Sequence, residues 1–217
     1  MRLTPFASTY GSRTSVSTER IETDVSSFCI WPMGQTLLQV NARAIADNAP
    51  DTFVQRCDEL VTGLHGESAV VLTVKTPDCV PVFLFDRSTL ASGLVHCGWR
   101  GLRDGVLPAT LRIMFESYSC RASQILVHIG PFICAEHYPV GPEVAELFPV
   151  AIERREGATY LDMGRIVSDQ ACAAGIPKEN ISEASVCTWE RDDLCYSYRR
   201  DWRMWSNALV SIGTYLR

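Results

Sequence analysis

Residues 76–101 read TPDCVPVFLFDRSTLASGLVHCGWRG, and this stretch decides how the chain is expected to fold. Two apolar runs flank a polar turn at 86–89, a pattern that predicts two neighbouring strands or a hairpin. Cys79 stands at the entrance of the first strand and His96 near the exit of the second. A thiol and an imidazole at adjacent strand ends can share a metal or form a nucleophile–base pair. We therefore expect the chemistry of this chain to lie here.

The remaining sequence predicts groups of strands separated by single helices. Strands are expected at 35–45, 69–75, 80–86, 90–97, 125–129, 181–186 and 208–216, and helices at 102–118, 141–147 and 165–174. Because the strands come in adjacent groups rather than in strict strand–helix alternation, we predict an α+β fold with mixed β-sheets and flanking helices. We expect a single domain over residues 1–217, in which residues 1–30 form a divergent N-terminal arm or an edge strand.

Composition and charge exclude several classes of function. The chain has 217 residues and a formal net charge of −5, which argues against a non-specific nucleic-acid binder. No segment approaches the roughly 20 apolar residues that cross a bilayer, and the N-terminus lacks the apolar core of a signal peptide. We therefore expect a cytoplasmic protein without a membrane partner. No glycine-rich phosphate loop is present, so no nucleotide cofactor is expected.

Nine cysteines are scattered along the chain. They are Cys29, Cys57, Cys79, Cys97, Cys120, Cys134, Cys172, Cys187 and Cys195. Their number is odd, no CxxC pair occurs, and most have apolar neighbours. This pattern predicts mainly buried free thiols rather than disulfides, and it argues against a closed structural zinc site with four ligands.

Several short motifs follow one another in a specific order. They are QVNA at 39–42, DELVT at 58–62, TPDCVPV at 76–82, VHCGWRG at 95–101, IGP at 129–131 with YPVG at 138–141, CT at 187–188 and SYRRD at 197–201. In these motifs the chain resembles the laccase-domain family, whose members are named polyphenol oxidases, purine nucleoside phosphorylases or peptidoglycan editing factors. The resemblance implies an α+β fold also likened to the cysteine deamidase domain of cytotoxic necrotizing factors. It further implies a zinc site of two histidines and one cysteine that acts on purine nucleosides.

Carried over to this sequence, the resemblance assigns Cys79 and His96 as metal ligands and catalytic residues. The family's other histidine belongs to a QVHG motif, where this chain has Asn41. A neutral amide oxygen is a poor zinc ligand, because zinc sites use thiolate, imidazole and carboxylate groups. A third ligand would have to come from Asn41, His65, Asp78 or solvent.

Further candidates surround this pair. Arg100 is assigned as a catalytic residue that holds an oxyanion such as phosphate, with a salt bridge as the alternative. The predicted substrate-binding residues are Asn41, Asp78, Trp99, Arg199 and Arg200, although paired arginines in a turn are often structural. Of the remaining histidines, we expect His128 to lie in the core with one hydrogen bond and His137 to lie on the surface.

These features leave three functions open. The first is a zinc-dependent enzyme that acts on purine nucleosides, by phosphorolysis of adenosine- or inosine-type substrates or by deamination. The second is a metal-free hydrolase or deamidase in which His96 activates the Cys79 thiol. The third is a non-catalytic descendant that binds a nucleoside or a protein. A copper oxidase ranks last, since one Cys and one His are too few for several copper centres. The expected partners are a purine nucleoside and phosphate, and the protein is expected to be a monomer or homodimer.

Overall fold

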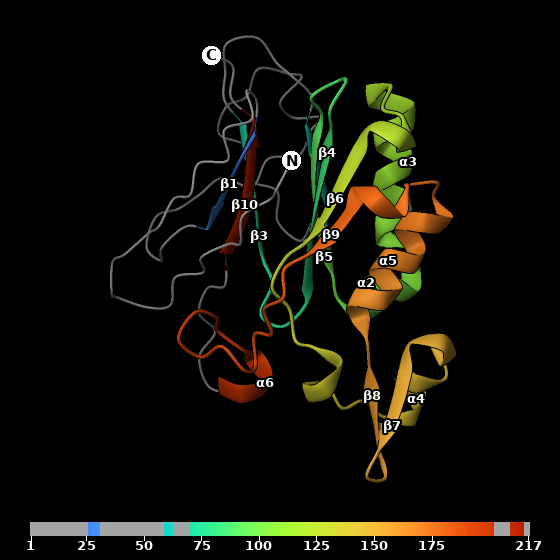
Figure 1. Ribbon diagram of the computed structural model, residues 1–217, viewed down its shortest axis with the longest axis vertical. Coiled ribbons are helices and arrows are strands. Elements are labelled where there is room, and N and C mark those ends of the chain that lie inside the picture. Colours follow the sequence, from blue (N-terminus) through green and yellow to red (C-terminus); the bar gives the residue numbers. More distant parts are fainter. Residues whose placement is uncertain (1–25, 31–58, 63–69, 202–208, 215–217) are drawn as a thin grey trace.

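The structure is a computed structural model that describes residues 26–30, 59–62, 70–201 and 209–214. The strand expected at 35–45, together with Asn41 and His65, lies outside these described residues. Figure 1 shows a layered arrangement in which two sheets lie side by side and the long helices cover the outer face of one of them. The predicted α+β fold with mixed sheets is therefore confirmed.

A mixed five-stranded sheet forms the centre. Its strands, in spatial order, are β2 (Glu59–Thr62), β5 (Ser92–Cys97), β4 (Val80–Asp86), β6 (Ile125–Ile129) and β9 (Ile181–Glu183). β6 and β9 pair in parallel, and the other neighbours are antiparallel. Every residue of β4 is buried, as expected for a strand covered on both faces. The hairpin predicted from residues 76–101 is thus confirmed as β4–β5.

The second sheet packs against the central one. It contains β1 (Ser26–Ile30), β10 (Leu209–Thr214) and β3 (Val70–Lys75) in that order, and β3 and β10 contact β5. β1 occupies an edge of this sheet, as one of the alternatives for residues 1–30 predicted. The opposite face of the central sheet is covered by α3 (Val106–Tyr118) and α5 (Met163–Ala173) (Figure 1). The main cluster of buried apolar side chains lies between these helices and the central sheet.

The single helix expected at 102–118 is wrong in its start and its continuity. A first helix, α2 (Trp99–Asp104), begins directly after β5, and α3 follows it. Gly105 separates the two helices with a φ of 77°, a conformation that glycine adopts without steric cost. The early start of α2 matters for function, because it places Trp99 and Arg100 beside the end of β5.

Shorter elements complete the described chain. They are α4 (Pro142–Ala145), α6 (Tyr198–Asp201), the 3₁₀ turns η1 (Ala122–Gln124), η2 (Ala135–His137), η3 (Pro149–Ala151) and η4 (Lys178–Asn180), and the hairpin β7 (Ile152–Arg155)–β8 (Ala158–Leu161). This hairpin was not predicted from the sequence. Its two-residue turn uses Glu156 and Gly157 at φ values of 50° and 79°, the positive values that a tight hairpin turn requires.

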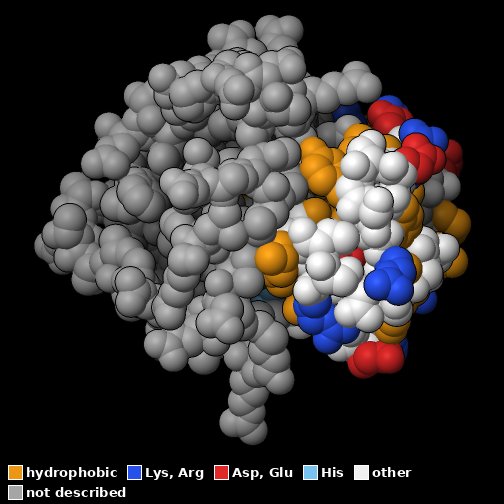
Figure 2. All heavy atoms as spheres, turned by 90° about the horizontal axis from the view of Figure 1, so that it is seen from above, with side chains coloured by type: hydrophobic (Ala, Val, Ile, Leu, Met, Phe, Trp, Pro, Cys, Tyr) orange, Lys and Arg blue, Asp and Glu red, His pale blue; other side chains and the backbone are white. Residues whose placement is uncertain are grey.

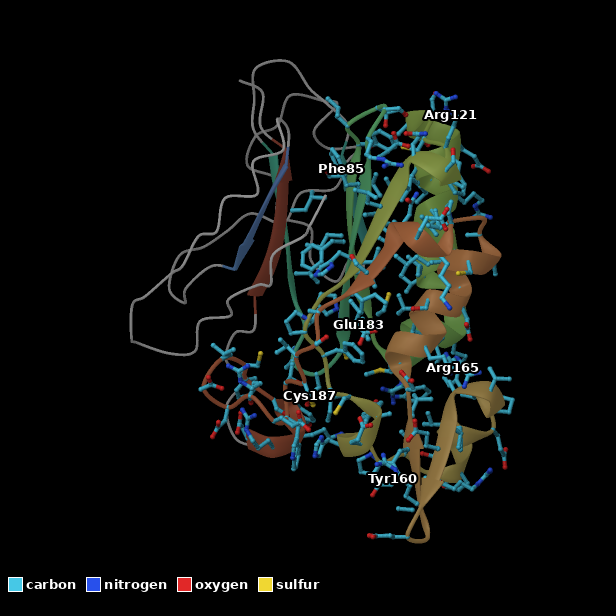
Figure 3. The ribbon with its side chains drawn as sticks, in the orientation of Figure 1. Phe85, Arg121, Tyr160, Arg165, Glu183 and Cys187 are labelled. Atoms are coloured by element: carbon cyan, nitrogen blue, oxygen red, sulfur yellow. The ribbon has the colours of Figure 1, made fainter. Side chains whose placement is uncertain are left out.

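Asp86 fixes the turn between β4 and β5. Its Oδ1 accepts hydrogen bonds from the backbone amides of Ser88 at 2.7 Å and Thr89 at 2.8 Å, and Oδ2 accepts one from the amide of Arg121 at 3.1 Å. Burial raises the pKa of Asp86, but these bonds and one from the Ser88 hydroxyl outweigh it, so the pKa lies below its usual value. Figure 3 shows Phe85 and Arg121 at this end of the molecule.

The described surface at this end carries acidic and basic side chains next to one another (Figure 2). No helix in the described ranges is both long and apolar enough to cross a membrane.

Candidate functional site: a Cys–His pair beside an arginine-flanked cavity

The register of the β4–β5 hairpin brings Cys79 and His96 to the same face of the sheet. Val80 pairs with Cys97, and Pro81 pairs with His96. Side chains alternate between faces along a strand, so Cys79 and Pro81 point to one side. By the same alternation His96 points to that side as well. The thiol and the imidazole are thus diagonal neighbours across the strand pair, within reach of a common ligand.

Gly98 leaves the space between these two side chains open. Continuing the register places Gly98 opposite Cys79. A Cβ added to Gly98 would lie 3.1 Å from Cys79 Sγ and 3.9 Å from His96 Nε2. Both ligand atoms therefore border one small volume that any side chain at position 98 would enter. A glycine at such a position is typical of sites where a ligand approaches the backbone closely.

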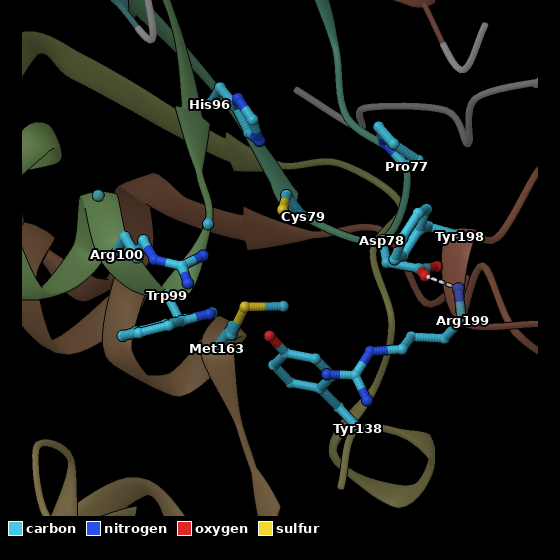
Figure 4. A pocket seen from close by; sticks show the side chains of 12 residues that line it. Pro77, Asp78, Cys79, His96, Trp99, Arg100, Tyr138, Met163, Tyr198 and Arg199 are labelled. Atoms are coloured by element: carbon cyan, nitrogen blue, oxygen red, sulfur yellow. Dashed lines mark hydrogen bonds between the residues drawn. The ribbon is translucent and has the colours of Figure 1, made fainter. Parts of the chain in front are cut away.

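A cavity of about 370 Å³ opens in front of this pair (Figure 4). Six of the predicted site residues line it: Asp78, Cys79, His96, Trp99, Arg100 and Arg199. Three further side chains in the lining, Tyr138, Met163 and Tyr198, were not predicted from the sequence. The volume falls in the range of about 300–1,000 Å³ that is usual for small-molecule sites.

Asp78 holds the wall of the cavity together. Its Oδ1 accepts a hydrogen bond from the Thr188 hydroxyl at 2.6 Å, and its Oδ2 accepts one from the Arg199 backbone amide at 2.7 Å (Figure 4). The residue is 5% exposed and has a φ of 69°, which aspartate tolerates better than most residues. Through these two hydrogen bonds Asp78 positions the loop at Thr188 and the helix α6.

Two arginines flank the cavity and give it a positive character. Arg100, exposed at the start of α2, lies with its guanidinium 4.3 Å from the centre of the Trp99 ring. Arg199 lies 4.9 Å from the centre of the Tyr138 ring, and its Nη1 donates a 3.3 Å hydrogen bond to the Pro139 carbonyl. Guanidinium groups positioned by aromatic rings keep further N–H donors for an anion. The cavity is therefore suited to a ligand that carries a phosphate or another oxyanion.

Tyr138 contributes a hydroxyl to the cavity. Burial raises the pKa of this phenol, and the nearby Cys79 raises it further, against the opposing effect of Arg199. The group therefore stays protonated in the neutral range and can donate a hydrogen bond to a bound molecule. In Figure 4 Tyr138 and Met163 face the side of the cavity on which Cys79 and His96 lie.

Arg200 does not line the cavity, in contrast to its neighbour Arg199. Its guanidinium donates to the carbonyls of Thr188 at 2.7 Å, Trp189 at 2.8 Å and Cys195 at 2.8 Å, and it pairs with Asp201 at 2.7 Å. These bonds tie the 188–195 loop to α6. Contrary to the expectation of a substrate-binding residue, Arg200 therefore supports the wall of the cavity.

His128 is the core histidine that the sequence predicted. It is 6% exposed, and its Nδ1 lies 2.9 Å from the Ser182 hydroxyl. Burial lowers the pKa of His128 to about 4. A neutral imidazole inside the sheet serves packing rather than the cavity.

The donor atoms at the cavity fit part of a zinc site. Within the described part of the chain, no third histidine, cysteine or carboxylate joins Cys79 and His96 in a group of potential ligands. One thiolate and one imidazole are donors that zinc prefers, and catalytic zinc ordinarily has three protein ligands and one open position. The pair and the space at Gly98 therefore suit a zinc ion that needs one further ligand. Asn41, the residue at the family's histidine position, lies outside the described residues.

A second group of potential metal ligands lies on the loops behind the cavity. Cys134 Sγ and Cys187 Sγ lie 3.2 Å and 3.8 Å from His137 Nδ1, and all three atoms lie within 4.8 Å of one another. The His137 side chain is 29% exposed, so the expectation of a surface residue is only partly met. Cys134 and His137 form a C-x2-H spacing, a signal that a search for CxxC pairs does not detect.

The seven cysteines of residues 70–201 are not joined in disulfides in this structure. Cys97, Cys120, Cys187 and Cys195 are buried, whereas Cys79 and Cys134 are partly exposed and Cys172 is exposed. The two clusters above thus use three of the thiols, of which Cys187 alone is buried.

The fold and this site define a class: a mixed α+β protein whose Cys–His pair faces an arginine-flanked cavity. Comparison with known proteins identifies the family. The family described as multi-copper polyphenol oxidoreductase laccase matches residues 21–210, and the chain belongs to it. The resemblance that the motifs indicated is therefore confirmed.

Individual relatives bear the names of nucleoside-processing enzymes. The chain is 34% identical over 158 residues to a purine nucleoside phosphorylase of Deinococcus radiodurans, covering 69% of this chain and 59% of that protein. It is 31% identical over 167 residues to adenosine deaminase RL5 of an unknown prokaryotic organism, covering 73% of this chain and 62% of that protein. Among solved structures, YlmD from Geobacillus stearothermophilus superposes with a TM-score of 0.68 at 28% identity, covering 76% of this chain and 63% of that one. The chain spans less than two thirds of the length of these proteins.

Proposed function

We propose that the cavity beside Cys79 and His96 is the active site of an enzyme that cleaves purine nucleosides by phosphorolysis, with a zinc ion held by these two residues. One observation carries the proposal: a thiol and an imidazole border the same space above Gly98, next to a cavity flanked by two arginines. The names of the relatives support the substrate class.

The reaction makes specific demands on the site. An oxygen of phosphate forms a bond to C1′ of the ribose, the bond from C1′ to the purine nitrogen breaks, and the purine leaves with the bonding electrons and gains a proton. The phosphate carries negative charge and must be held next to the sugar. Zinc, when bound, supplies Lewis-acid stabilisation of developing negative charge.

The residues of the chain would divide this work. Cys79 and His96 would hold the metal, and Arg100 would position the phosphate together with Arg199. Positioning of two reactants in one cavity contributes a large part of such a rate enhancement. Trp99 offers an aromatic surface near the mouth, although Arg100 already covers one part of it. The Tyr138 hydroxyl, which stays protonated, would donate a hydrogen bond to the purine or the sugar.

Two other functions remain as outcomes of the test. Deamination uses water in place of phosphate, and the name of one relative favours it. In a metal-free mechanism, Cys79 would attack the substrate with His96 as base. Arginines on both sides of the cavity favour phosphorolysis over these two, because neither requires an inorganic anion.

The test is a product assay on the 217-residue chain with inosine and adenosine. The chain is stripped of metal and reloaded with zinc, and each assay is run with and without phosphate. We expect release of the free base that requires both zinc and phosphate, and that is lost in Cys79→Ser and His96→Ala but kept in Cys172→Ser, whose thiol is exposed elsewhere. Ammonia release without phosphate would indicate deamination instead. Full activity of the metal-free chain, abolished by alkylation of Cys79, would establish the thiol mechanism.

A further inference from the structure

The Cys134–His137–Cys187 group is built by two loop segments that hydrogen bonds hold together. Phe132 and Cys187 form a parallel bridge, and the Thr188 amide donates a 2.9 Å hydrogen bond to the Phe132 carbonyl. Cys134 directly precedes the short turn η2 and His137 is its last residue, and the backbone bond from the His137 amide to the Cys134 carbonyl measures 3.1 Å. The three donor atoms thus converge because the backbone is fixed on both sides.

The spacing of these atoms suits a tetrahedral metal. With Zn–S bonds of about 2.3 Å and Zn–N bonds of about 2.0 Å, a tetrahedral angle separates sulfur from nitrogen by about 3.5 Å. The two observed distances from His137 Nδ1 to the sulfur atoms, 3.2 Å and 3.8 Å, lie on either side of this value. Each sulfur–nitrogen distance therefore lies within about 0.3 Å of the separation in a tetrahedral zinc site.

The surroundings of the group resemble the outer shell of a metal site. The Cys134 amide donates to Cys187 Sγ at 3.3 Å, an interaction that orients the sulfur and stabilises it as a thiolate. Trp189 stacks against the His137 ring with centroids 5.8 Å apart and an angle of 11° between the planes. On the exposed side, Glu190 Oε1 lies 3.7 Å from His137 Nδ1 and can supply a carboxylate.

We infer that Cys134, His137 and Cys187 bind a zinc ion in a second site, separate from the cavity, with Glu190 as the fourth ligand. Two sulfur donors and one imidazole favour zinc or monovalent copper over magnesium or calcium, and the carboxylate favours zinc of these two. The site uses none of the residues assigned to the proposed reaction.

A disulfide accounts less well for the cluster than a bound metal does. A disulfide between Cys134 and Cys187 would leave the approach of His137 and Glu190 to the same point unexplained.

A metal bound to this group would stabilise the wall of the cavity. His137 directly precedes Tyr138, which lines the cavity, and Cys187 precedes Thr188, which donates to Asp78. Figure 3 shows Cys187 in the lower half of the molecule, beyond the ends of the central strands. A metal here would link the two loops that carry these wall residues.

The experiment measures metal binding in a background that lacks the cavity thiol. Cys79→Ser protein is stripped of metal under a reductant and titrated with zinc against a chromogenic chelator, and then with cobalt(II) as a spectroscopic probe. We expect about one equivalent of tightly bound zinc and, with cobalt, the thiolate charge-transfer and d–d bands of a tetrahedral site. Adding Cys187→Ser should weaken zinc binding at least about 100-fold, since a protein ligand is lost. Adding Cys172→Ser, at an exposed cysteine, should change nothing.

A second variant covers the case in which loss of Cys187 prevents folding. His137→Gln in the same background changes a partly exposed side chain, and circular dichroism of the metal-free protein establishes that it is folded. It should weaken zinc binding by a similar factor. The inference is overturned if Cys79→Ser protein binds no zinc under reductant, or if both added variants bind zinc as tightly as their parent. Because the readout uses neither activity nor Cys79, its failure and that of the proposed function are distinguishable.

Discussion

The molecule presents two cysteine–histidine groups that differ in what surrounds them. Cys79 and His96 contribute two donors and border a cavity of about 370 Å³, with a glycine in place of a third side chain. Cys134, His137 and Cys187 contribute three donors that converge within 4.8 Å of one another on packed loops. The same residue types thus occur once in an open arrangement and once in a nearly closed one.

This difference separates two roles that a metal can have. Catalytic sites keep a coordination position open for substrate or water, whereas structural sites complete their ligand set with protein atoms. By this criterion the Cys79 pair suits catalysis, and the Cys134 group suits stabilisation. We therefore expect changes at the first group to alter turnover and changes at the second to alter stability.

The largest expected effect comes from adding a side chain at Gly98, in the space between Cys79 and His96. In Gly98→Ala, the new Cβ would lie 3.1 Å from Cys79 Sγ, which is tighter than ordinary contacts and forces the thiol to shift. We expect turnover to fall about 100-fold, as small misplacements in an active site commonly cause. Steady-state assays with inosine and phosphate measure this effect.

The same variant also provides an internal control. Zinc bound at Cys134, His137 and Cys187 should be unchanged in Gly98→Ala protein. If turnover stays within a factor of about two of the unchanged protein, the space at Gly98 is not part of the reacting site, since a displaced ligand cannot leave catalysis intact.

Zinc should stabilise the fold through the second group. At a zinc concentration about 100 times the dissociation constant, a ligand bound only to the native state adds about 2.7 kcal/mol. For a chain of this size that corresponds to a rise in Tm of roughly 5–10 °C. Scanning calorimetry should show this rise for Cys79→Ser protein, in which the zinc ligands at the cavity are incomplete. Adding Cys187→Ser to this protein should abolish the rise, and a full rise there would contradict the assignment of the second group to stability.

The two groups also differed in how well the sequence predicted them. The Cys79–His96 pair depends on a hairpin whose strands and turn are local in the sequence, so the two apolar runs and the turn at 86–89 were sufficient to predict it. The Cys134–Cys187 contact joins residues 53 positions apart through a bridge between loops. No periodic pattern encodes such a contact, and only the C-x2-H spacing hinted at it.

Two further errors of prediction have equally physical causes. The break between α2 and α3 depends on the backbone of Gly105, whereas the apolar spacing of 102–118 fits one continuous helix. Arg199 and Arg200 are adjacent in sequence, yet one lines the cavity and the other binds three carbonyls. The two side chains leave α6 in different directions, and the residue type alone does not determine this direction.

Acid should destabilise the folded protein through His128, independently of the two cysteine–histidine groups. The pKa of His128 is lowered from 6.5 to about 4 by burial, so between these values the unfolded chain binds a proton that the folded chain does not. Stability therefore falls as the pH drops below 6.5, by about 2 kcal/mol at pH 5 at about 1.4 kcal/mol per pH unit. Urea unfolding at pH 7 and pH 5 measures this change, and His128→Asn should reduce it.

A matched variant separates the charge of His128 from its hydrogen bond. Ser182→Ala removes the hydroxyl 2.9 Å from Nδ1 but keeps the buried imidazole. It should keep the loss of stability between pH 7 and pH 5, even though the absolute stability is lower. With these variants in a metal-free buffer, proton-linked and zinc-linked stability can be told apart. An unchanged pH dependence in His128→Asn would assign the acid effect to other groups.

The smallest expected effect concerns the binding of phosphate in the cavity beside Cys79 and His96. Arg100 lines the cavity, whereas Arg103, which also lies near the Trp99 ring at 5.9 Å, does not line it and pairs with Asp104 at 2.6 Å. Arg100→Ala should raise the KM for phosphate about tenfold, which corresponds to about 1.4 kcal/mol for a charge-assisted contact. Arg103→Ala should leave this KM within a factor of about two, because its surface ion pair contributes little. Equal effects of the two substitutions would mean that general positive charge near α2, rather than a specific contact from Arg100, attracts the phosphate.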